Sequence, residues 1–430
     1  MTKTGTFLAV AACLATISLK AQTSFKFDFG SGAIKKGYTQ ILPESVYSKE
    51  KGYGFLQGAS LTAASHGKDA LKGDFVTSDK PFYFTVDIPE GDYDVKVILG
   101  DAIGESEQTV RAECRRAMIY RETTAKGEIK EKTFTVHVRR PGIAGTNEKV
   151  TLKPREFGYF HWDNQLTLEF NGASPKVCAV EIKKAEKPIR VFLAGNSTVV
   201  DQASEPFAAW GQMIPAFFAP GKVSVANYAE SGETLSNFLA GKRLKKILSQ
   251  MRKGDYLFIE FGHNDQKQKG EGIGAFTSYK RDLKYFIAEA RKKGGIPVIV
   301  TSIQRRNFND EGKINETLGD YPEACRQTAK EENVSLIDLN KMTKVMYEAW
   351  GRQESENAFA HNPQIDNTHP NPFGAFEMAK CVMNGIKDAK LGIAKYIVNF
   401  DGFDPSKPEL ISSFYWPLSP SKSTVKPDGN

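Results

Sequence analysis

The hydrophobic pattern of the chain changes its period once, near Lys187 and Pro188. Between residues 22 and 186, apolar and polar residues alternate in short runs, which places one face of each predicted strand in a core. These runs span residues 82–88, 93–99, 132–139, 166–170 and 177–182. Turn-forming residues between the first two runs predict a hairpin. Because no long helical pattern occurs in this half of the sequence, we expect an antiparallel β-sandwich.

After residue 188 the apolar runs become continuous and alternate with segments of helical periodicity. Segments such as 234–251 and 278–293 have the period of amphipathic helices. The apolar runs between such segments have no polar face, so we expect strands that are buried on both sides. These runs span residues 189–194, 223–228, 256–261, 296–303 and 334–339. Helical crossovers between buried strands predict a five-stranded parallel sheet with helices on both faces, a three-layer αβα fold.

The first 21 residues have the pattern of a signal peptide. Lys3 precedes an apolar stretch from Phe7 to Leu19, which is too short to span a bilayer comfortably, and cleavage is expected near Ala21. A lipoprotein box ending at Cys13 is the alternative, and it ranks lower because the apolar stretch continues past the cysteine. Both interpretations predict an exported chain that is secreted and becomes periplasmic, cell-surface or extracellular. No later segment has the roughly 18 unbroken apolar residues of a membrane span.

These boundaries predict a signal peptide at 1–21, a β-sandwich domain at 22–187, an α/β domain at 188–400 and a C-terminal extension at 401–430. Removing the signal peptide takes away two lysines and no acidic residue, so the formal net charge falls from +7 to +5. That excess is compatible with an anionic polysaccharide partner, but scattered surface charge is the preferred explanation. The extension is rich in Pro and Ser, and it either wraps back on the β-sandwich or trails from the domain.

The remaining cysteines do not have the close spacing of zinc sites or redox pairs. They are Cys114, Cys178, Cys325 and Cys381. Three of the four lie in apolar patterns, so we expect buried free thiols. One or two disulfides are the alternative in an oxidising compartment.

Three of the predicted parallel strands end in small or polar residues. The carboxyl ends of parallel strands meet at one edge of the sheet, where ligands bind in α/β folds. Each residue alone has a structural explanation. Ser197 can cap a helix, Gly232 can allow a positive φ, and Asn264 can stabilise a loop through hydrogen bonds. Their coincidence at one edge predicts a site. The three segments are Gly195-Asn196-Ser197-Thr198, Ser231-Gly232-Glu233 and Gly262-His263-Asn264-Asp265.

A fourth segment supplies Asp366 and His369, three residues apart, ahead of a predicted helix. A serine hydroxyl is a poor nucleophile at neutral pH, so it needs an imidazole to take its proton and a carboxylate to orient that imidazole. Attack on an ester also creates an oxyanion that requires fixed N–H donors. The backbone of Ser197 and Gly232 and the side chain of Asn264 can supply them. The residues of the four segments together therefore predict acyl transfer.

The segments GNSTV, ESGET, EFGHND and DNTHPNPFGA resemble, in their order along the chain, the four sequence blocks of the SGNH (GDSL-type) hydrolases. The resemblance covers roughly residues 189–390 and is closest to the rhamnogalacturonan acetylesterase branch, carbohydrate esterase family 12. It implies a catalytic triad and an oxyanion hole whose members match residues of this sequence. These are Ser197 as nucleophile and oxyanion donor, Gly232 and Asn264 as the other donors, His369 as base and Asp366 as its partner.

One position departs from the family pattern, because the aspartate usual before the nucleophile is Asn196 here. An amide can order the turn through hydrogen bonds but brings no charge. The serine also lacks the G-x-S-x-G elbow, which argues against a lipase of the α/β-hydrolase fold.

A metal site is the alternative use of the same segments, with His263 and Asp265 joined by His369 and Asp366. A bound metal would occupy the imidazole that the serine needs, and the other histidines do not lie in a ligand-like arrangement in the sequence. We therefore expect no metal and no cofactor.

The N-terminal stretch 25–55 resembles the galactose-binding-like or malectin-like β-sandwich that accompanies some of these esterases. Its tyrosines, Tyr38, Tyr47 and Tyr53, either stack on sugar rings or pack the sandwich.

The resemblance implies a secreted carbohydrate O-acetylesterase whose partner is an acetylated plant cell-wall polysaccharide, pectic rhamnogalacturonan, with no nucleic acid and no membrane span. Acetylated xylan or another acetylated glycan is the alternative substrate. A polysaccharide-binding protein with an inactive esterase domain is the alternative function.

Overall fold

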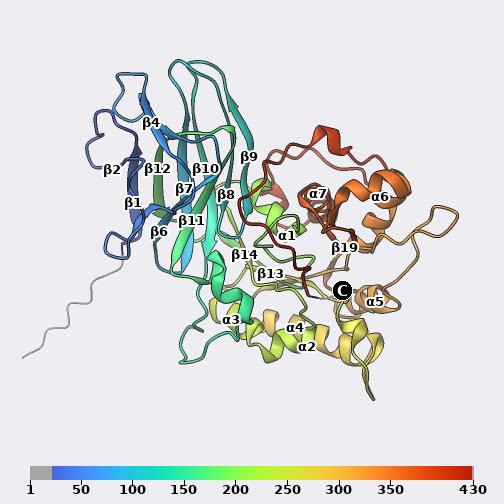
Figure 1. Cartoon of the computed structure of the whole chain (residues 1–430). Helices are drawn as coiled ribbons and strands as arrows, with labels where there is room; N and C mark the ends of the chain where they lie inside the picture. Colours follow the sequence, from blue (N-terminus) through green and yellow to red (C-terminus); the bar gives the residue numbers. More distant parts are fainter. Residues whose placement is uncertain (1–21, 429–430) are drawn as a thin grey trace, which may run out of the picture.

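Two β-sheets pack face to face in the N-terminal half of the computed structural model, which describes residues 22–428 (Figure 1). The predicted signal peptide and the alternative lipoprotein box at Cys13 lie outside the described residues. The predicted β-sandwich is confirmed, and a single pair of neighbouring strands in these two sheets, β1 and β2, is parallel.

The first sheet has the strand order β10-β7-β12-β1-β2, and β5 and β4 extend it beside β12. Its strands are β1 (Ser24–Phe29), β2 (Thr39–Ile41), β4 (Thr62–Ser65), β5 (Asp74–Thr77), β7 (Gly91–Gly100), β10 (Ile129–Val138) and β12 (Lys176–Lys184). The second sheet has the order β3-β6-β11-β8-β9. Its strands are β3 (Tyr53–Phe55), β6 (Phe82–Asp87), β8 (Ser106–Ala112), β9 (Arg116–Thr124) and β11 (Gln165–Ser174).

Phenylalanine rings fill the space between the two sheets. The ring centroid of Phe84, from β6, lies 5.0 Å from that of Phe27 and 4.9 Å from that of Phe29, both from β1. Phe55 of β3 lies 5.5 Å away, and all three contacts are edge-to-face. Such pairs add stabilisation beyond the area that they bury, so this aromatic cluster holds the two sheets together.

The predicted hairpin between residues 82–88 and 93–99 is wrong. β6 pairs with β3 and β11 in the second sheet, whereas β7 pairs with β10 and β12 in the first. The turn between them therefore carries the chain from one sheet to the other. Both strands have an alternating pattern, which requires one buried face but does not say which strand lies alongside. The partners of β7 come from residues far along the chain.

The tyrosines of the N-terminal stretch belong to the sandwich. The hydroxyl of Tyr38 donates to Glu181 at 2.7 Å, and that of Tyr47 donates to Asp87 at 3.0 Å. Tyr53 packs against Phe27 with ring centroids 5.1 Å apart. All three tyrosines are half-buried, which favours the packing interpretation.

The C-terminal half contains the predicted five-stranded parallel sheet, with the strand order β14-β13-β15-β16-β17. Its strands are β13 (Ile189–Gly195), β14 (Val223–Asn227), β15 (Tyr256–Glu260), β16 (Ile296–Val300) and β17 (Ser335–Ile337), and a separate hairpin joins β18 (Phe359–His361) to β19 (Ile365–Pro370). The α-helices are α1 (Trp210–Met213), α2 (Leu235–Ala240), α3 (Arg243–Gln250), α4 (Lys280–Lys292), α5 (Tyr321–Glu331), α6 (Leu339–Glu354) and α7 (Pro372–Asp388). Short 3-10 turns are η1 (Pro154–Gly158), η2 (Phe160–Trp162), η3 (Ile214–Phe217), η4 (Asp265–Lys267), η6 (Ser355–Ala358), η7 (Ala394–Tyr396) and η8 (Ile411–Ser413), and η5 (Ala275–Tyr279) is a π-helical turn.

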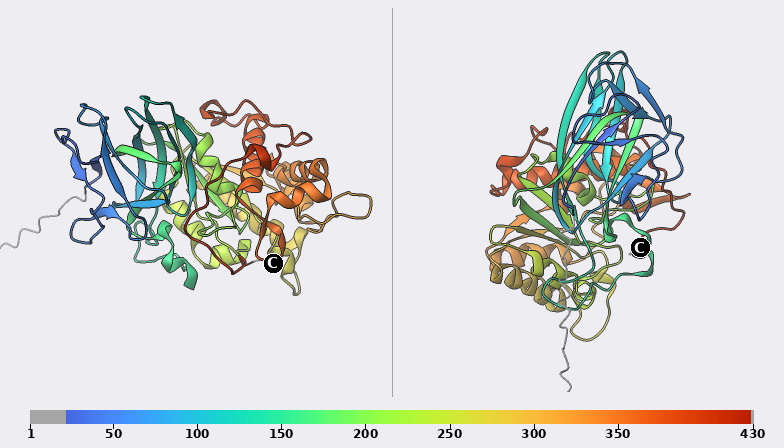
Figure 2. Two further views of the ribbon diagram at one scale, coloured as in Figure 1. Left: turned by 45° about the horizontal axis from the view of Figure 1, so that its top comes forward. Right: turned by 90° about the vertical axis from the view of Figure 1, so that its left-hand side faces the viewer.

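The two faces of this sheet belong to two different hydrophobic cores. Val191 and Leu193 of β13 face a core formed with α1, α6 and α7. Phe192 and Ala194 of the same strand face the core formed with α2, α3, α4 and α5. The helices therefore lie in two layers on opposite sides of the sheet (Figures 1 and 2), as expected for continuous apolar strands.

The helical segment predicted at 234–251 is two helices rather than one. α2 ends at Ala240, and α3 begins at Arg243. Between them Lys242 has φ +61°, a left-handed conformation that cannot continue a helix.

The C-terminal extension wraps back over the N-terminal domain (Figure 1), as one of the two alternatives predicted. The guanidinium of Arg111 lies 4.0 Å from the ring centroid of Trp416. The hydroxyl of Ser419 donates to Glu169 at 2.7 Å. Further along, the backbone of Ser423 donates to the carbonyl of Glu205 at 2.9 Å, so the extension lies along both domains.

The four described cysteines are free and buried, as predicted. Within residues 22–428 there is also no helix with the length and apolar character that a membrane crossing needs.

Buried ion pairs join the two domains. The guanidinium of Arg116, on β9, donates to Asp201 at 2.7 Å and to the carbonyl of His137 at 2.8 Å. Arg190 of β13 donates to Asp92 of β7 at 2.7 Å, and His137 lies 2.8 Å from the same carboxylate. Burial alone would raise the pKa of Asp92, but His137 and Arg190 hold it below its ordinary value. The interface between the domains therefore depends on oppositely charged groups that are buried in contact with each other.

We expect Arg116→Met to destabilise the whole chain by about 3–5 kcal/mol, since it leaves the buried Asp201 carboxylate without its cation. Thermal or urea unfolding of the full chain measures the change. The matched control is Arg281→Met, which removes the same charge from a side chain that is 72% exposed and should change stability by less than about 0.5 kcal/mol. Equal stability of the two variants would contradict the importance of the pair.

Candidate active site

The three strand-end segments lie at the carboxyl edge of the parallel sheet. Ser197 follows β13, Gly232 follows β14 and Asn264 follows β15, and these strands are neighbours in the sheet. Hydrogen bonds connect the segments to one another. The side-chain amide of Gln202 donates to the carbonyl of Ser197 at 2.9 Å and lies 3.5 Å from the hydroxyl of Ser231. The parallel topology thus brings together residues from three separate turns.

Ser197, His369 and Asp366 form a chain of hydrogen bonds. The hydroxyl oxygen of Ser197 lies 2.8 Å from Nε2 of His369, and Nδ1 of His369 lies 2.9 Å from Oδ2 of Asp366. All three side chains are at most 1% exposed. With Nδ1 protonated toward the carboxylate, Nε2 is left as the acceptor for the serine proton. The arrangement can therefore deprotonate Ser197 when it attacks a carbonyl carbon.

The turn that carries His369 is ordered by Asp366 itself. Oδ1 of Asp366 accepts from the backbone N–H groups of Thr368 and His369 at 2.9 and 3.0 Å. Two residues later Asn371 caps α7, because its side chain accepts from the backbone of Gly374 at 3.1 Å. One oxygen of the carboxylate thus shapes the turn while the other orients the imidazole.

Gly232 and Asn264 lie on the two neighbouring turns. Gly232 has φ +77°, a conformation that strains any residue with a side chain. The amide of Asn264 donates to the carbonyl of Glu233 at 3.0 Å, which ties it to the residue next to Gly232. Because that bond uses only one of its two N–H groups, the Asn264 side chain has a second donor.

Asn196 orders the turn that carries Ser197 without a charge. Its Oδ1 accepts from the backbone N–H of Thr198 at 3.0 Å and from the Thr198 hydroxyl at 2.9 Å. The same hydroxyl lies 2.7 Å from Glu260, whose other oxygen accepts from the indole of Trp210 at 2.5 Å. Burial raises the pKa of Glu260 to about 7. A protonated Glu260 can donate to Thr198, which leaves the single Thr198 proton for Asn196.

His263 and Asp265, considered above as metal ligands, serve the backbone. The Nε2 of His263 lies 3.0 Å from the carbonyl of Ile303. The two oxygens of Asp265 accept from the N–H groups of Leu235 and Gly262, both at 2.9 Å. These contacts give both residues a structural role.

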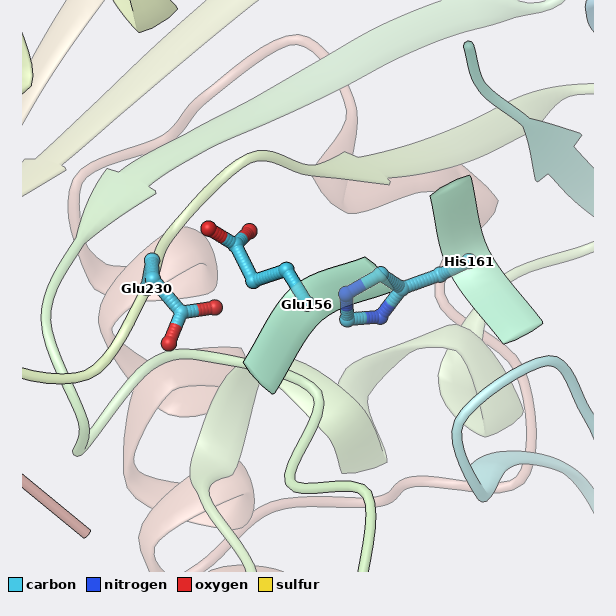
Figure 3. Close-up of side chains that lie close together, drawn as sticks. All are labelled: Glu156, His161 and Glu230. Carbon is cyan, nitrogen blue, oxygen red and sulfur yellow. The ribbon is translucent and has the colours of Figure 1, made fainter. Parts of the chain in front are cut away.

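Glu156, His161 and Glu230 are the one group in the described part of the chain whose ligand atoms come close enough to hold a metal ion (Figure 3). Both carboxylates already have a cation, since Glu156 pairs with Arg243 and Glu230 pairs with Arg155. Burial lowers the pKa of His161, and three nearby arginines, Arg139, Arg116 and Arg243, lower it further. The same positive charges would repel a cation there. The charges around this cluster therefore do not suit a divalent cation.

The N-terminal domain contributes two residues that the sequence did not indicate. Lys153 and Arg155 both donate to the carbonyl of Ser231, at 2.5 and 2.8 Å. Lys153 also pairs with Glu233 at 2.7 Å, and Arg155 pairs with Glu230 at 2.7 Å. They therefore clamp the turn that holds Gly232. A basic residue pair in a loop has no distinctive pattern, so the sequence could not have shown this contact.

Residues 193–375 match the GDSL-like lipase/acylhydrolase family, and residues 25–138 match the β-agarase/YXIM esterase-like, galactose-binding domain-like family. The chain is 42% identical over 229 residues to the rhamnogalacturonan acetylesterase RhgT of Bacillus subtilis (strain 168), covering 50% of this chain and 97% of that protein. It is 27% identical over 391 residues to the uncharacterized esterase YxiM of the same strain, covering 86% of this chain and 92% of that one. A crystal structure of Bacillus subtilis YXIM is 25% identical and covers 86% of this chain and 99% of its own, with a TM-score of 0.46.

The pKa of Glu260 leads to a testable dependence of stability on pH. Because its pKa in the folded chain is about 7, above the ordinary 4.5, the folded state binds this proton more tightly. The stabilisation is complete below pH 4.5 and falls as the pH rises toward 7. Over that range we expect the free energy of unfolding of the parent chain to fall by about 2–3 kcal/mol more than that of Glu260→Gln, because glutamine resembles the protonated carboxyl group and does not titrate. Chemical unfolding from pH 5 to pH 8 measures this difference, and parallel curves would contradict it.

Proposed function

Since the chain belongs to the GDSL-like lipase/acylhydrolase family and is a carboxylic ester hydrolase, we propose that it removes acetyl groups from pectic rhamnogalacturonan. The Ser197–His369–Asp366 chain of hydrogen bonds is the observation that carries the proposal, because it is the arrangement that acyl transfer needs. The similarity to a rhamnogalacturonan acetylesterase along 97% of that protein supports the choice of substrate.

In the proposed first half-reaction, the oxygen of Ser197 attacks the acetyl carbonyl carbon while Nε2 of His369 takes the serine proton. Asp366 stabilises the imidazolium that forms and keeps its ring in place. When the tetrahedral intermediate collapses, His369 protonates the departing sugar oxygen. The acetyl group is then bound to Ser197 as an ester.

In the second half-reaction, His369 takes a proton from water, and the water oxygen attacks the acetyl carbonyl. Acetate leaves when the proton returns to the serine oxygen, so the enzyme is regenerated without a cofactor. In both intermediates the oxyanion is stabilised by the backbone N–H groups of Ser197 and Gly232 and by the amide of Asn264.

We also propose that the protein acts outside the cytoplasm, where a polysaccharide substrate would meet it. The apolar stretch from Phe7 to Leu19 after Lys3 supports this, since it has the length of a signal-peptide core.

The first test compares acetate release from acetylated rhamnogalacturonan and acetylated xylan by the parent chain and by Ser197→Ala. We expect release from the pectic polymer, reduced about 10³-fold or more in kcat by the substitution. Unchanged thermal unfolding of the variant is the control for folding. Release from xylan alone would contradict the proposed substrate. No release from either polymer or from 4-nitrophenyl acetate would favour a polysaccharide-binding protein.

A second test concerns the oxyanion donors. Asn264→Ala should lower kcat by about 100- to 1000-fold, because one donor to the oxyanion is lost, while KM changes little. Steady-state kinetics with 4-nitrophenyl acetate separates the two constants. A rise in KM with unchanged kcat would instead make Asn264 a residue that binds the ground state.

A further inference from the structure

A cavity of about 360 Å³ adjoins the proposed catalytic site. Its walls come from four parts of the chain: the N-terminal domain, the turn after Ser197, Ser231 and the C-terminal extension. Phe207, in one wall, lies edge-on to the imidazole of His369, with ring centroids 6.1 Å apart. Gln202, in the same wall, donates to the carbonyl of Ser197 at 2.9 Å. A molecule in this cavity would therefore be separated from Ser197 and His369 by the side chains of Gln202 and Phe207.

The side chains that line the cavity suit an acidic sugar. Arg155, Lys422 and Lys426 supply three positive charges, against the one carboxylate of Asp428. Tyr159 and Phe207 also line it, so aromatic surface is available for the apolar face of a sugar ring. The volume is at the lower end of the range for ligand pockets, about 300–1,000 Å³, and fits a small ligand.

The guanidinium of Arg155 is held on one side by Glu230 and the Ser231 carbonyl, and on the other side by Asp428. Its Nε and Nη2 donate to the same oxygen of Glu230, at 2.9 and 2.7 Å, and Nη2 also donates to the carbonyl of Ser231. The remaining nitrogen, Nη1, donates to the carboxylate of Asp428. Because Glu230 and Ser231 fix the guanidinium, its Nη1 side can bind an anion in place of Asp428 at little cost in side-chain entropy.

Asp428 brings that carboxylate directly against the turn of Gly232. A Cβ atom added to Gly232 would lie only 2.8 Å from the Cβ of Asp428. The side chain of Asp428 is 59% exposed and that of Arg155 is 31% exposed. Exposed ion pairs contribute about 0–1 kcal/mol, so another carboxylate can replace this one.

We propose that Arg155 binds the carboxylate of a uronate residue in the acetylated glycan, and that Asp428 occupies this position in the free protein. Arg155 then determines specificity for anionic substrates and comes from the N-terminal domain, outside the regions 25–138 and 193–375 that match known families. The inference rests on the proposed esterase function and adds a reason why an acidic polymer is preferred to a neutral one.

The test measures kcat and KM with acetylated rhamnogalacturonan, with the same polymer after methyl esterification of its carboxylates, and with 4-nitrophenyl acetate. For Arg155→Met we expect kcat/KM to fall about 10- to 100-fold on the charged polymer, mainly through KM. Because Arg155 also holds the Ser231 turn, we expect some loss of kcat on every substrate. The signature of carboxylate binding is a fall in kcat/KM on the methyl-esterified polymer and the small ester that is at least about threefold smaller than on the charged polymer. Arg281→Met is the matched control for charge, and Arg155→Lys should retain part of the preference for the charged polymer.

The second variant, Asp428→Asn, leaves Arg155 in place. We expect KM for the charged polymer to fall by about two- to fivefold in the parent background, within the range of an exposed ion pair, and no change in the Arg155→Met background. An equal loss on all three substrates for Arg155→Met would overturn the inference, since Arg155 would then only position the Ser231 turn. The proposed function would stand in that case, whereas it fails if the parent chain hydrolyses none of the three.

Discussion

The buried pair of Arg116 and Asp201 joins the N-terminal domain to the turn that presents Ser197. Asp201 also accepts from the amide of Asn227 at 2.8 Å, and that amide donates to the carbonyl of Val199 at 2.7 Å. A cation from β9 is therefore connected through two hydrogen-bonding side chains to the first turns after β13 and β14. Because neither charge has access to water, removing one would leave the other buried and unpaired, which would lower the free energy of unfolding. The geometry of the Ser197 turn thus depends on a residue of the other domain.

The two domains have different parts in the proposed mechanism. Residues that break and form bonds, Ser197 and His369 among them, come from the α/β domain, where the parallel strands place them at one edge. The N-terminal domain contributes Lys153 and Arg155, which hold the turn of Gly232 and line the cavity beside it. The proposed division of work is that one domain performs the chemistry while both domains and the C-terminal extension form the substrate site.

The sequence predicted local structure and the edge of the sheet well, because these follow from periodicity and from the direction of parallel strands. The pairing of Asp366 with His369 could also be predicted, because the two residues are only three positions apart in one turn. The hairpin between 82–88 and 93–99 could not be judged from local pattern, because strand pairing in a sandwich depends on partners far along the chain. The contact of Arg155 with the Ser231 turn could not be predicted either, because the two residues are also far apart in the sequence.

By itself the sequence determined the two-domain order, the parallel sheet and the residues able to carry out acyl transfer. These properties follow from the period of apolar residues and from the chemistry of single side chains. The tertiary structure decided which strands pair, which charges share a buried interface and which cations hold the Ser231 turn. Those contacts join residues that are far apart in the sequence, such as Arg155 and Asp428. They stabilise the protein only after folding has brought both partners into the same buried interface or cavity.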